Sequence, residues 1–282
     1  MSRRERRDGG ARDETPPPAP TPLNVDVVDA HCHLDLMDGD VAANLAAAQA
    51  VGVRRVVTIG VDVPTSQWSA QAAEQYDDVY AAVAMHPNEA HLADDAALQE
   101  IARLAGLPNV VAVGETGLDF YRDTATEAQQ QASFRAHIQI AKDSGKALVI
   151  HDREAHDAVL QALADEGAPD RVVFHCFSGD AAMARICADR GYVMSFAGNL
   201  TFKNAQHLRD ALAVAPLDLL LVETDAPFLT PMPHRGQPNA PYLIPLTVRA
   251  MAAVKAVDED EMAAALGANA ARIFALPTAT IG

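Results

Sequence analysis

The segment Val28-Asp29-Ala30-His31-Cys32-His33-Leu34 begins the folded part of the chain and predicts a strand that carries metal ligands. Successive side chains of a strand point to opposite faces, so we expect His31 and His33 on one face and Cys32 on the other. Two imidazoles on one face can bind one cation, although such a pair taken alone is more often polar surface. Further candidate ligands at the ends of later apolar runs favour the metal site.

Short runs rich in β-branched residues alternate with longer alanine-rich segments of helical periodicity. We expect strands at residues 25–31, 54–61, 79–85, 110–115, 147–151, 171–175, 192–196 and 219–223. We expect helices at residues 41–49, 64–75, 96–104, 126–144, 155–166, 181–190 and 205–213, with closing helices at 241–254 and 259–274. Eight such units predict the α/β class and a closed (β/α)8 TIM barrel. An open doubly wound sheet is the alternative, but it would gather its ligands at one crevice.

The first 24 residues differ from the rest in composition. Arginines alternate with acids there, and Pro16-Pro17-Pro18-Ala19-Pro20-Thr21-Pro22 follows, which is typical of a disordered arm. We therefore divide the chain into an arm at residues 1–24 and a single TIM-barrel domain at residues 25–282. The sequence shows no apolar stretch suited to a signal peptide or a membrane span, so we expect a cytoplasmic protein without membrane association.

The chain contains only three cysteines, Cys32, Cys176 and Cys187. Three cysteines cannot form a disulfide framework, so we expect reduced thiols that pack in the core. Cys32 and Cys176 each follow a candidate ligand directly. Strand alternation is expected to turn both thiols away from the site.

The net charge of the chain is -16 at pH 7, and the arm contributes five arginines against four acids, which leaves about -17 for the barrel. This is the wrong sign for a protein that binds nucleic acid tightly over a broad surface. A nuclease is still possible, because a deep site with two divalent cations is locally positive whatever the outer surface carries.

Four more candidate ligands follow apolar runs, namely Glu115, His151, His175 and Asp225. Taken singly they could be a solvated glutamate, two core histidines and a helix cap. A carboxylate at a buried strand end must be paired or bind a metal, and its two oxygens can bridge two cations about 3.5 to 4 Å apart. Together with His31 and His33 these residues form a mixed nitrogen and oxygen set, which suits one or two ions of zinc, manganese or magnesium.

Five ordered motifs resemble the TatD-type metal-dependent deoxyribonucleases, which are amidohydrolase-like metallohydrolases. The motifs are Asp29-Ala30-His31-Cys32-His33-Leu34-Asp35, Gly114-Glu115-Thr116-Gly117-Leu118-Asp119, Ile150-His151, His175-Cys176-Phe177-Ser178-Gly179 and Glu223-Thr224-Asp225-Ala226-Pro227. The resemblance runs from about residue 26 to the C-terminus and includes residues 198–204, Arg235-Gly236 and Asn239. It implies a TIM-barrel hydrolase whose divalent cations are bound by His31, His33, Glu115, His151, His175 and Asp225. One departure is His86-Pro87-Asn88, where the family tends to have His-Pro-His.

The chemistry expected of this site needs few further residues. A divalent cation lowers the pKa of water toward neutrality and so provides a nucleophile, whose proton we expect Asp225 to accept. Glu223 lies two residues earlier on the same strand and could orient a ligand histidine, or could be a buried paired acid. His86 could contact a phosphate, assist a leaving group or be structural. The cations available for phosphate, if they are not ordinary surface residues, are Arg153, Lys203 and Arg235.

We expect a monomeric deoxyribonuclease that works from an end, taken as the 3′ end, and favours single strands or frayed ends of DNA. The alternative is an amide, lactone or ester hydrolase of the amidohydrolase type, including the D-aminoacyl-tRNA deacylation associated with some TatD relatives. Many amidohydrolases carry a bridging lysine at the end of strand four, whereas this chain has Glu115 there. A binding protein without catalysis is a third possibility, which the complete ligand set disfavours.

Overall fold

The computed structural model describes residues 14–277, so residues 1–13 of the predicted arm lie outside the described part of the chain. Eight parallel strands are hydrogen-bonded in the order in which they occur in the sequence. They are β1 (Val27–Cys32), β2 (Val53–Ile59), β3 (Val79–Val83), β4 (Val110–Asp119), β5 (Ala147–Arg153), β6 (Val172–Phe174), β7 (Val193–Phe196) and β8 (Leu220–Val222). The predicted α/β class and TIM barrel are confirmed.

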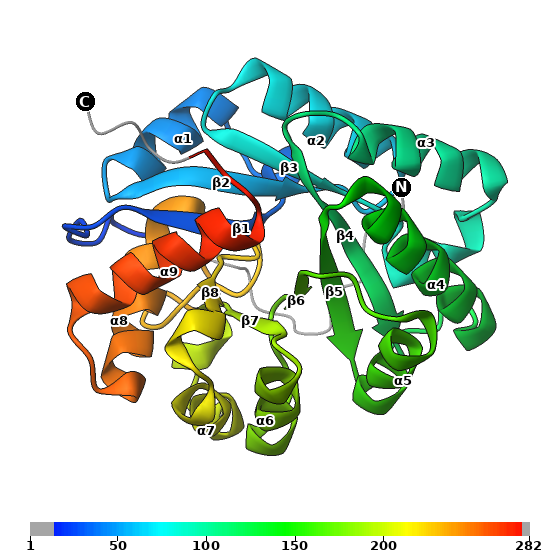
Figure 1. The fold of residues 1–282 in the computed structure, drawn as a ribbon. Helices are drawn as coiled ribbons and strands as arrows, with labels where there is room; N and C mark the ends of the chain where they lie inside the picture. The colour runs from blue at the N-terminus through cyan, green and yellow to red at the C-terminus, as the bar shows by residue number, and fades with distance from the viewer. Residues whose placement is uncertain (1–13, 278–282) are drawn as a thin grey trace.

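Helices surround the strands on the outside of the barrel (Figure 1). They are α1 (Val41–Gln49), α2 (Val63–Gln75), α3 (Asp95–Ala105), α4 (Glu127–Ser144), α5 (His156–Glu166), α6 (Ala181–Asp189), α7 (Gln206–Val214), α8 (Ile244–Lys255) and α9 (Glu259–Ile273). Short 3-10 helices lie in the connections, namely η1 (Leu34–Leu36), η2 (Pro87–Leu92), η3 (Gly198–Thr201), η4 (Leu217–Leu219) and η5 (Pro241–Leu243). None of the helices within residues 14–277 has the length and apolarity needed to cross a membrane.

Local sequence signals explain several helix boundaries. Asp62 and Thr126 each accept a hydrogen bond from the third residue of the following helix, and that residue's side chain bonds back, so both form capping boxes. Gly145 ends α4 with a φ of 62°, a left-handed conformation that glycine adopts without steric cost. The helices therefore begin and end close to where the sequence predicts.

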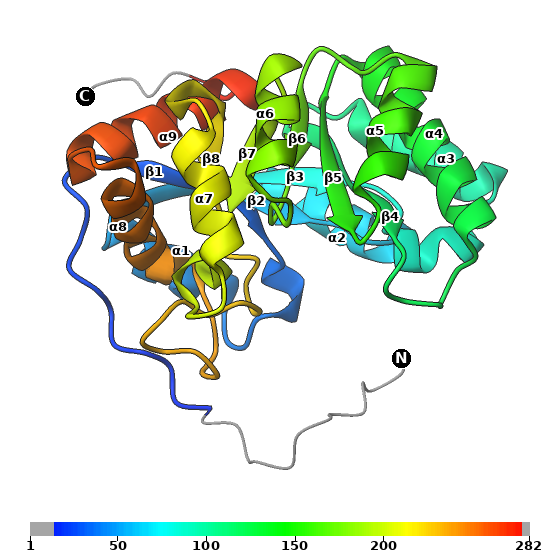
Figure 2. The same ribbon diagram turned by 90° about the horizontal axis from the view of Figure 1, so that it is seen from below.

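The barrel is closed by the segment that follows β8 rather than by β8 itself. Cys32 forms an isolated bridge with Ala226, and the N–H of His33 donates to the carbonyl of Ala226 at 2.8 Å. The N–H of Asp225 donates to the carbonyl of His31 at 2.9 Å. The loops after β1 and β8 accordingly project from the same end of the barrel (Figure 2). Closure of the barrel thus places His31 in β1 and His33 directly after it, together called the histidines of β1 below, beside Asp225.

Two apolar clusters stabilise this arrangement. The larger joins the strands to the surrounding helices and includes Phe134, Phe174 and Phe196, which are almost fully buried. The smaller joins strand residues such as Val57 to Phe274, which follows α9. The end of α9 lies on the side of the barrel away from the loops after β1 and β8 (Figure 2). The apolar contacts of Phe274 are therefore at the opposite end of the barrel from these loops.

Part of the predicted arm lies on the barrel. Leu23 is buried, and its N–H donates to the carbonyl of Val51 at 3.0 Å. The hydroxyl of Tyr242 donates to the carbonyl of Pro17 at 2.7 Å, and the guanidinium of Arg249 donates to the carbonyl of Thr21 at 2.9 Å. A proline-rich segment has few N–H groups but keeps its carbonyl groups as acceptors. Side-chain donors from η5 and α8 therefore hold this segment on the barrel.

Candidate metal centre

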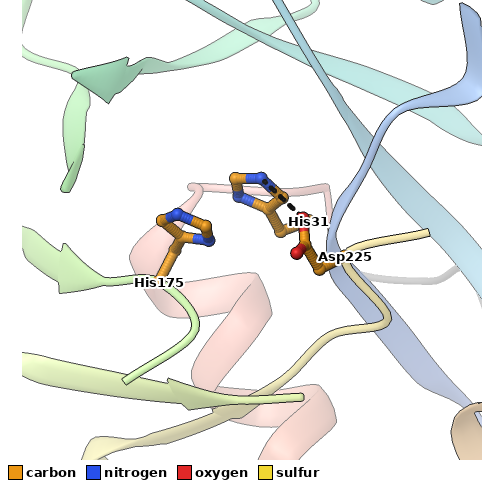
Figure 3. Close-up of side chains that lie close together, drawn as sticks. All are labelled: His31, His175 and Asp225. Atoms are coloured by element: carbon orange, nitrogen blue, oxygen red, sulfur yellow. Dashed lines mark ion pairs between the residues drawn. The ribbon is translucent and has the colours of Figure 1, made fainter. Parts of the chain in front are cut away.

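The buried carboxylate of Glu115 lies at the centre of the candidate site. Its Oε1 atom is 3.9 Å from Nε2 of His31 and 3.6 Å from Nε2 of His33. The Oδ1 atom of Asp225 is 3.8 Å and 3.5 Å from the same two nitrogens. Figure 3 shows Asp225 beside the ring of His31, with His175 on the other side of that ring. Two carboxylate oxygens from β4 and from the loop after β8 therefore face the histidine pair of β1.

The other oxygen of Glu115 faces a second group of imidazoles. Its Oε2 atom is 2.8 Å from Nε2 of His175, 3.4 Å from Nδ1 of His151 and 3.8 Å from Nε2 of His86. His175 directly follows β6, His151 lies within β5 near its end, and His86 lies in the connection after β3. One carboxylate therefore has a separate group of nitrogens at each of its two oxygens.

These side chains fit a divalent cation. Three groups of ligand atoms each lie within 4.8 Å of one another, namely His31 with His33 and Glu115, His31 with His175 and Asp225, and His86 with Glu115 and His151. His31 is fully buried, yet neither of its ring nitrogens has a hydrogen-bond partner among residues 14–277. A buried polar group without a partner is costly, and a cation bound by an imidazole nitrogen would remove that cost.

The protonation states of His31 and Glu115 favour metal binding. Burial, together with the neighbouring His175, holds the pKa of His31 well below its ordinary value, so this ring is neutral and has a free lone pair. Burial acts to raise the pKa of Glu115, but the surrounding histidines His86, His175 and His151 together outweigh it and hold that pKa well below the ordinary value. A neutral imidazole and an ionised carboxylate are the forms that bind metal ions.

Two carboxylates orient His151 in β5 and His175, which directly follows β6. Glu223 Oε1 lies 3.3 Å from Nδ1 of His175, and it also accepts a hydrogen bond from the N–H of Cys176 at 2.7 Å. Asp119 Oδ2 lies 3.3 Å from Nε2 of His151. In both pairs the carboxylate leaves the other ring nitrogen facing Glu115, as in the carboxylate–histidine pairs of metal sites. From the sequence, Glu223 could orient a ligand histidine or be a buried paired acid, and the structure places its carboxylate beside His175.

The sequence prediction did not include Asp119 among the site residues, although Asp119 ends the motif that contains Glu115. β4 continues to Asp119, four residues beyond the end that the sequence predicts at Glu115. Asp119 lines the same cavity as Glu115, and both carboxylates contact the ring of His151.

His86 differs from the other histidines. The N–H of Asn88 donates to its Nδ1 atom at 3.0 Å, so the neutral ring carries its proton on Nε2. Burial lowers the pKa of His86 to about 3, which keeps the ring neutral. An Nε2–H group is a hydrogen-bond donor and has no lone pair for a cation. This arrangement suits a contact with a substrate oxygen better than metal binding.

The candidate ligands open into a cavity of about 460 Å³. Its lining residues are His33, His86, Asn88, Glu115, Asp119, Arg122, His151, Asp152, Arg153, His175, Cys176, Ser178, Asn199, Asp225, Phe228 and Leu229. Of the three cations that the sequence suggests for phosphate, Arg153 lines this cavity, whereas Lys203 and Arg235 are not among its lining residues. Arg235 instead places its guanidinium over the ring of Phe202, 4.3 Å from the ring centroid. Arg122, which the sequence prediction did not include, also lines the cavity, and its signal is its place in the loop directly after β4.

The expectation for Cys176 is wrong. Its thiol was predicted to face away from the site, but the residue lines the cavity, and the side-chain amide of Asn199 donates to its sulfur at 3.7 Å. β6 already ends at Phe174, and Cys176 has a φ of 41°, so the alternation of a strand does not apply to it. Cys32 lies within β1, is buried, and turns its sulfur toward the carbonyl of Val57 as predicted.

Comparison with known proteins identifies the family. The sequence profile of the family described as TatD related DNase matches residues 28–275. The chain is 48% identical over 259 residues to the "Uncharacterized metal-dependent hydrolase TatD" of Mycobacterium tuberculosis, covering 89% of this chain and 98% of that protein. It is 39% identical over 254 residues to the "Uncharacterized metal-dependent hydrolase YcfH" of Escherichia coli K12, covering 88% and 95%.

Solved structures agree with this assignment. The crystal structure of YJJV, a TatD homologue from Escherichia coli K12, has a TM-score of 0.85 and 30% identity, and the match covers 89% of this chain and 98% of that chain. A TatD family hydrolase from Entamoeba histolytica has a TM-score of 0.80 and 17% identity, and the match covers 92% of this chain and 100% of that chain. At this identity the match shows that the two proteins share a fold. The chain therefore belongs to the TatD family of metal-dependent hydrolases.

Proposed function

We propose that this protein hydrolyses phosphodiester bonds of DNA at the centre around Glu115. The observation that carries the proposal is the position of this carboxylate, which offers Oε1 to the histidines of β1 and Oε2 to His151 and His175. Such a residue is suited to be shared by two divalent cations, of magnesium, manganese or zinc. His31, His33 and Asp225 would hold one of them, and His151 and His175 the other. When bound, these ions would lower the pKa of water and stabilise charge that develops on phosphate oxygens.

The side chains of the protein have separate roles in this proposal. Asp225 orients the attacking water and accepts its proton, because one of its oxygens faces the histidines of β1 and the residue lines the cavity. His86 donates its Nε2 proton in a hydrogen bond to a phosphate or leaving-group oxygen. Glu223 holds the ring of His175, and Arg153 binds phosphate at the cavity wall.

The charge of the cavity supports an anionic substrate once metal is bound. Among its lining residues are the four carboxylates of Glu115, Asp119, Asp152 and Asp225, and the guanidinium groups of Arg122 and Arg153. With neutral histidines, one divalent cation cancels the excess negative charge and a second makes the cavity positive. A negatively charged protein can in this way accept a phosphodiester in its cavity while its outer surface repels long DNA. The DNase description of the matching family profile agrees with this.

We further propose that the enzyme is a monomer that works from the 3′ end and prefers single strands or frayed ends. A cavity of about 460 Å³ is in the range of small-molecule sites, so it suits a terminal nucleotide better than a stretch of duplex. Oligonucleotides labelled at either end would reveal the polarity, and light scattering the mass in solution.

The decisive experiment compares substrates with protein that has been loaded with manganese. A short single-stranded DNA should be cleaved in preference to a matched RNA, a D-aminoacyl-tRNA and a simple lactone. Asp225→Asn should lower the turnover of DNA at least about a hundredfold, the usual scale for loss of a general base. Asp210→Asn, on the exposed face of α7, is the matched control and should retain turnover. Cleavage of the lactone or the aminoacyl ester without cleavage of DNA would contradict the proposal.

A further inference from the structure

We infer that Arg122 and Arg153 form a phosphate subsite separate from the metal centre, which binds the phosphate next to the one that is cleaved. The inference rests on the proposed phosphodiesterase function and narrows its substrate class. The enzyme would act on oligonucleotides that carry at least two consecutive phosphates, rather than on isolated phosphodiesters.

The two arginines come from the ends of neighbouring strands and both line the cavity. Arg153 ends β5, and Arg122 lies three residues beyond the end of β4. The two strands pair in parallel up to Asp119 and Arg153, so both guanidinium groups start from the same end of one strand pair. Both residues line the cavity that contains Glu115 and His151.

Arg122 forms only a loose ion pair with Asp119, and Arg153 also interacts electrostatically with that carboxyl. Nε of Arg122 is 3.9 Å from Oδ2 of Asp119, and the side chain of Arg153 makes no hydrogen bond or ion pair within residues 14–277. The nearby acids also have other partners. Asp119 contacts His151, and Asp152 Oδ2 lies 2.7 Å from Nδ1 of His156. The arginines therefore keep donors for an anion, and a guanidinium can bind phosphate through two parallel hydrogen bonds.

Both arginines are positioned before a substrate binds. The guanidinium of Arg153 lies over the ring of Tyr121, 4.0 Å from its centroid, a distance at which cation–π attraction holds the side chain. Asp119 Oδ1 accepts hydrogen bonds from the N–H groups of Tyr121 at 3.1 Å and Arg122 at 3.0 Å. Less conformational entropy is lost on binding when the contacting groups are already ordered.

The same aspartate ties this subsite to the metal centre. Its Oδ1 atom holds the loop that carries Arg122, and its Oδ2 atom contacts Nε2 of the candidate ligand His151. A phosphate on the arginines is thus adjacent to, but distinct from, a phosphate at Glu115. The neighbouring phosphate of the same strand meets this requirement, whereas a substrate with one phosphate can occupy only one of the two places.

The test compares substrates that differ by one phosphate. Bis(4-nitrophenyl) phosphate and the dinucleotide TpT each contain one phosphodiester and no neighbouring phosphate, whereas pTpT and TpTp add a phosphate on one side. With the manganese-loaded enzyme, one of the two phosphorylated dinucleotides should exceed TpT in kcat/KM by about tenfold, the scale of one charge-assisted hydrogen bond. Equal values for all three dinucleotides would overturn the inference.

Variants then assign the advantage to the arginines. Arg122→Gln and Arg153→Gln should each remove most of the advantage, through KM, and should lower kcat/KM on the favoured phosphorylated dinucleotide about tenfold more than the rate on bis(4-nitrophenyl) phosphate. Arg153→Lys, which keeps the charge but loses the planar fork, should keep part of the advantage. Arg185→Gln, an exposed arginine on α6 outside the cavity, is the control and should behave as wild type.

Two other outcomes have separate meanings. If the arginine variants retain their metal content and thermal midpoint but lose the rate on bis(4-nitrophenyl) phosphate equally, the arginines act on the cleaved phosphate and the inference is wrong. If the wild type cleaves no phosphodiester but does cleave a lactone or an aminoacyl ester, the proposed function fails, and the subsite fails with it.

Discussion

The carboxylate of Asp29 accepts two hydrogen bonds from Thr224, one from the hydroxyl at 2.5 Å and one from the backbone N–H at 2.9 Å. Both residues are buried. Asp29 lies two residues before His31, and Thr224 directly precedes Asp225. This pair therefore joins the two chain segments that close the barrel, and each of these segments carries a candidate ligand.

Loss of this contact should weaken both the fold and the site. Thr224→Val removes the hydroxyl donor and leaves a buried carboxylate oxygen unsatisfied, so we expect a loss of about 1–3 kcal/mol in the free energy of unfolding and weaker manganese binding. Urea denaturation and manganese titration measure the two effects. Ser69→Ala removes a buried hydroxyl that has no hydrogen bond within residues 14–277, so it should change little. Equal behaviour of the two variants would contradict the role of Thr224.

The metal content should follow Glu115. We expect the wild type to bind up to two equivalents of manganese, because a carboxylate that faces two groups of imidazoles can bridge two ions. Glu115→Ala should lose at least one equivalent, whereas Glu127→Ala, at the exposed start of α4, should lose none. Metal analysis after equilibrium dialysis gives both numbers. A wild type that is fully active with a single bound ion would exclude the shared-carboxylate arrangement.

Gly117 should be irreplaceable for a steric reason. It has a φ of 138°, and a Cβ atom placed there would collide with the backbone carbonyl oxygen of His151. Gly117→Ala should therefore displace β5 at a candidate ligand, with a loss of about 1–3 kcal/mol in stability and a loss of bound metal. Gly191→Ala is the control, since Gly191 also has a positive φ, 70°, but no heavy atom within 4 Å of its Cβ position. Retention of metal by Gly117→Ala would show that metal binding does not require the close contact between Gly117 and the carbonyl of His151.

Acid should destabilise the fold through His137. The N–H of Met85 donates to its Nε2 atom at 3.0 Å, and its Nδ1 atom donates to the carbonyl of Ser133 at 2.7 Å, so the buried ring is neutral. Burial lowers the pKa of His137 from 6.5 to about 4. Between these values the unfolded chain binds a proton that the folded chain excludes, so stability is present above pH 6.5 and is lost as the pH falls toward 4.

The size and test of this effect follow from the same linkage. The loss attributable to His137 should reach at most roughly 3 kcal/mol. His137→Gln should be less stable than wild type at neutral pH but should lose less stability on acidification, which urea midpoints at several pH values can show. The same substitution at His207, which is exposed on α7, controls for the removal of one histidine. Parallel pH profiles for wild type and His137→Gln would refute the assignment.

The dependence of DNA binding on salt should be shallow. Because the outer surface is negative, few phosphates can contact lysine or arginine, and the logarithmic slope should correspond to roughly one to three contacts. We now expect Arg122 and Arg153 to supply most of them, because Lys203 and Arg235 are not among the residues that line the cavity. Matched linear and circular single strands, cleaved at several salt concentrations, test this and the need for an end. Equal cleavage of the circle, or a steep slope, would contradict the expectation.

Local patterns in the sequence were sufficient for the fold. Each predicted strand overlaps an observed one, because runs of β-branched residues between helical segments leave few other arrangements in a chain of this length. The largest difference is in β4, which extends to Asp119 along β5. Pairing with a neighbouring strand determines where a strand ends, and that neighbour cannot be read from local sequence.

The sequence by itself determined that His31, His33, Glu115, His151, His175 and Asp225 would meet, because the carboxyl ends of parallel strands in a closed barrel gather at one end. Only the tertiary structure decided which oxygen of Glu115 faces which histidines, and that Asp29 joins Thr224 across the barrel closure. It also decided that Arg122 and Cys176 line the cavity and Lys203 does not. These features depend on backbone angles in the loops and on contacts between residues far apart in the chain, whereas sequence periodicity reports only which face of a regular element a side chain occupies.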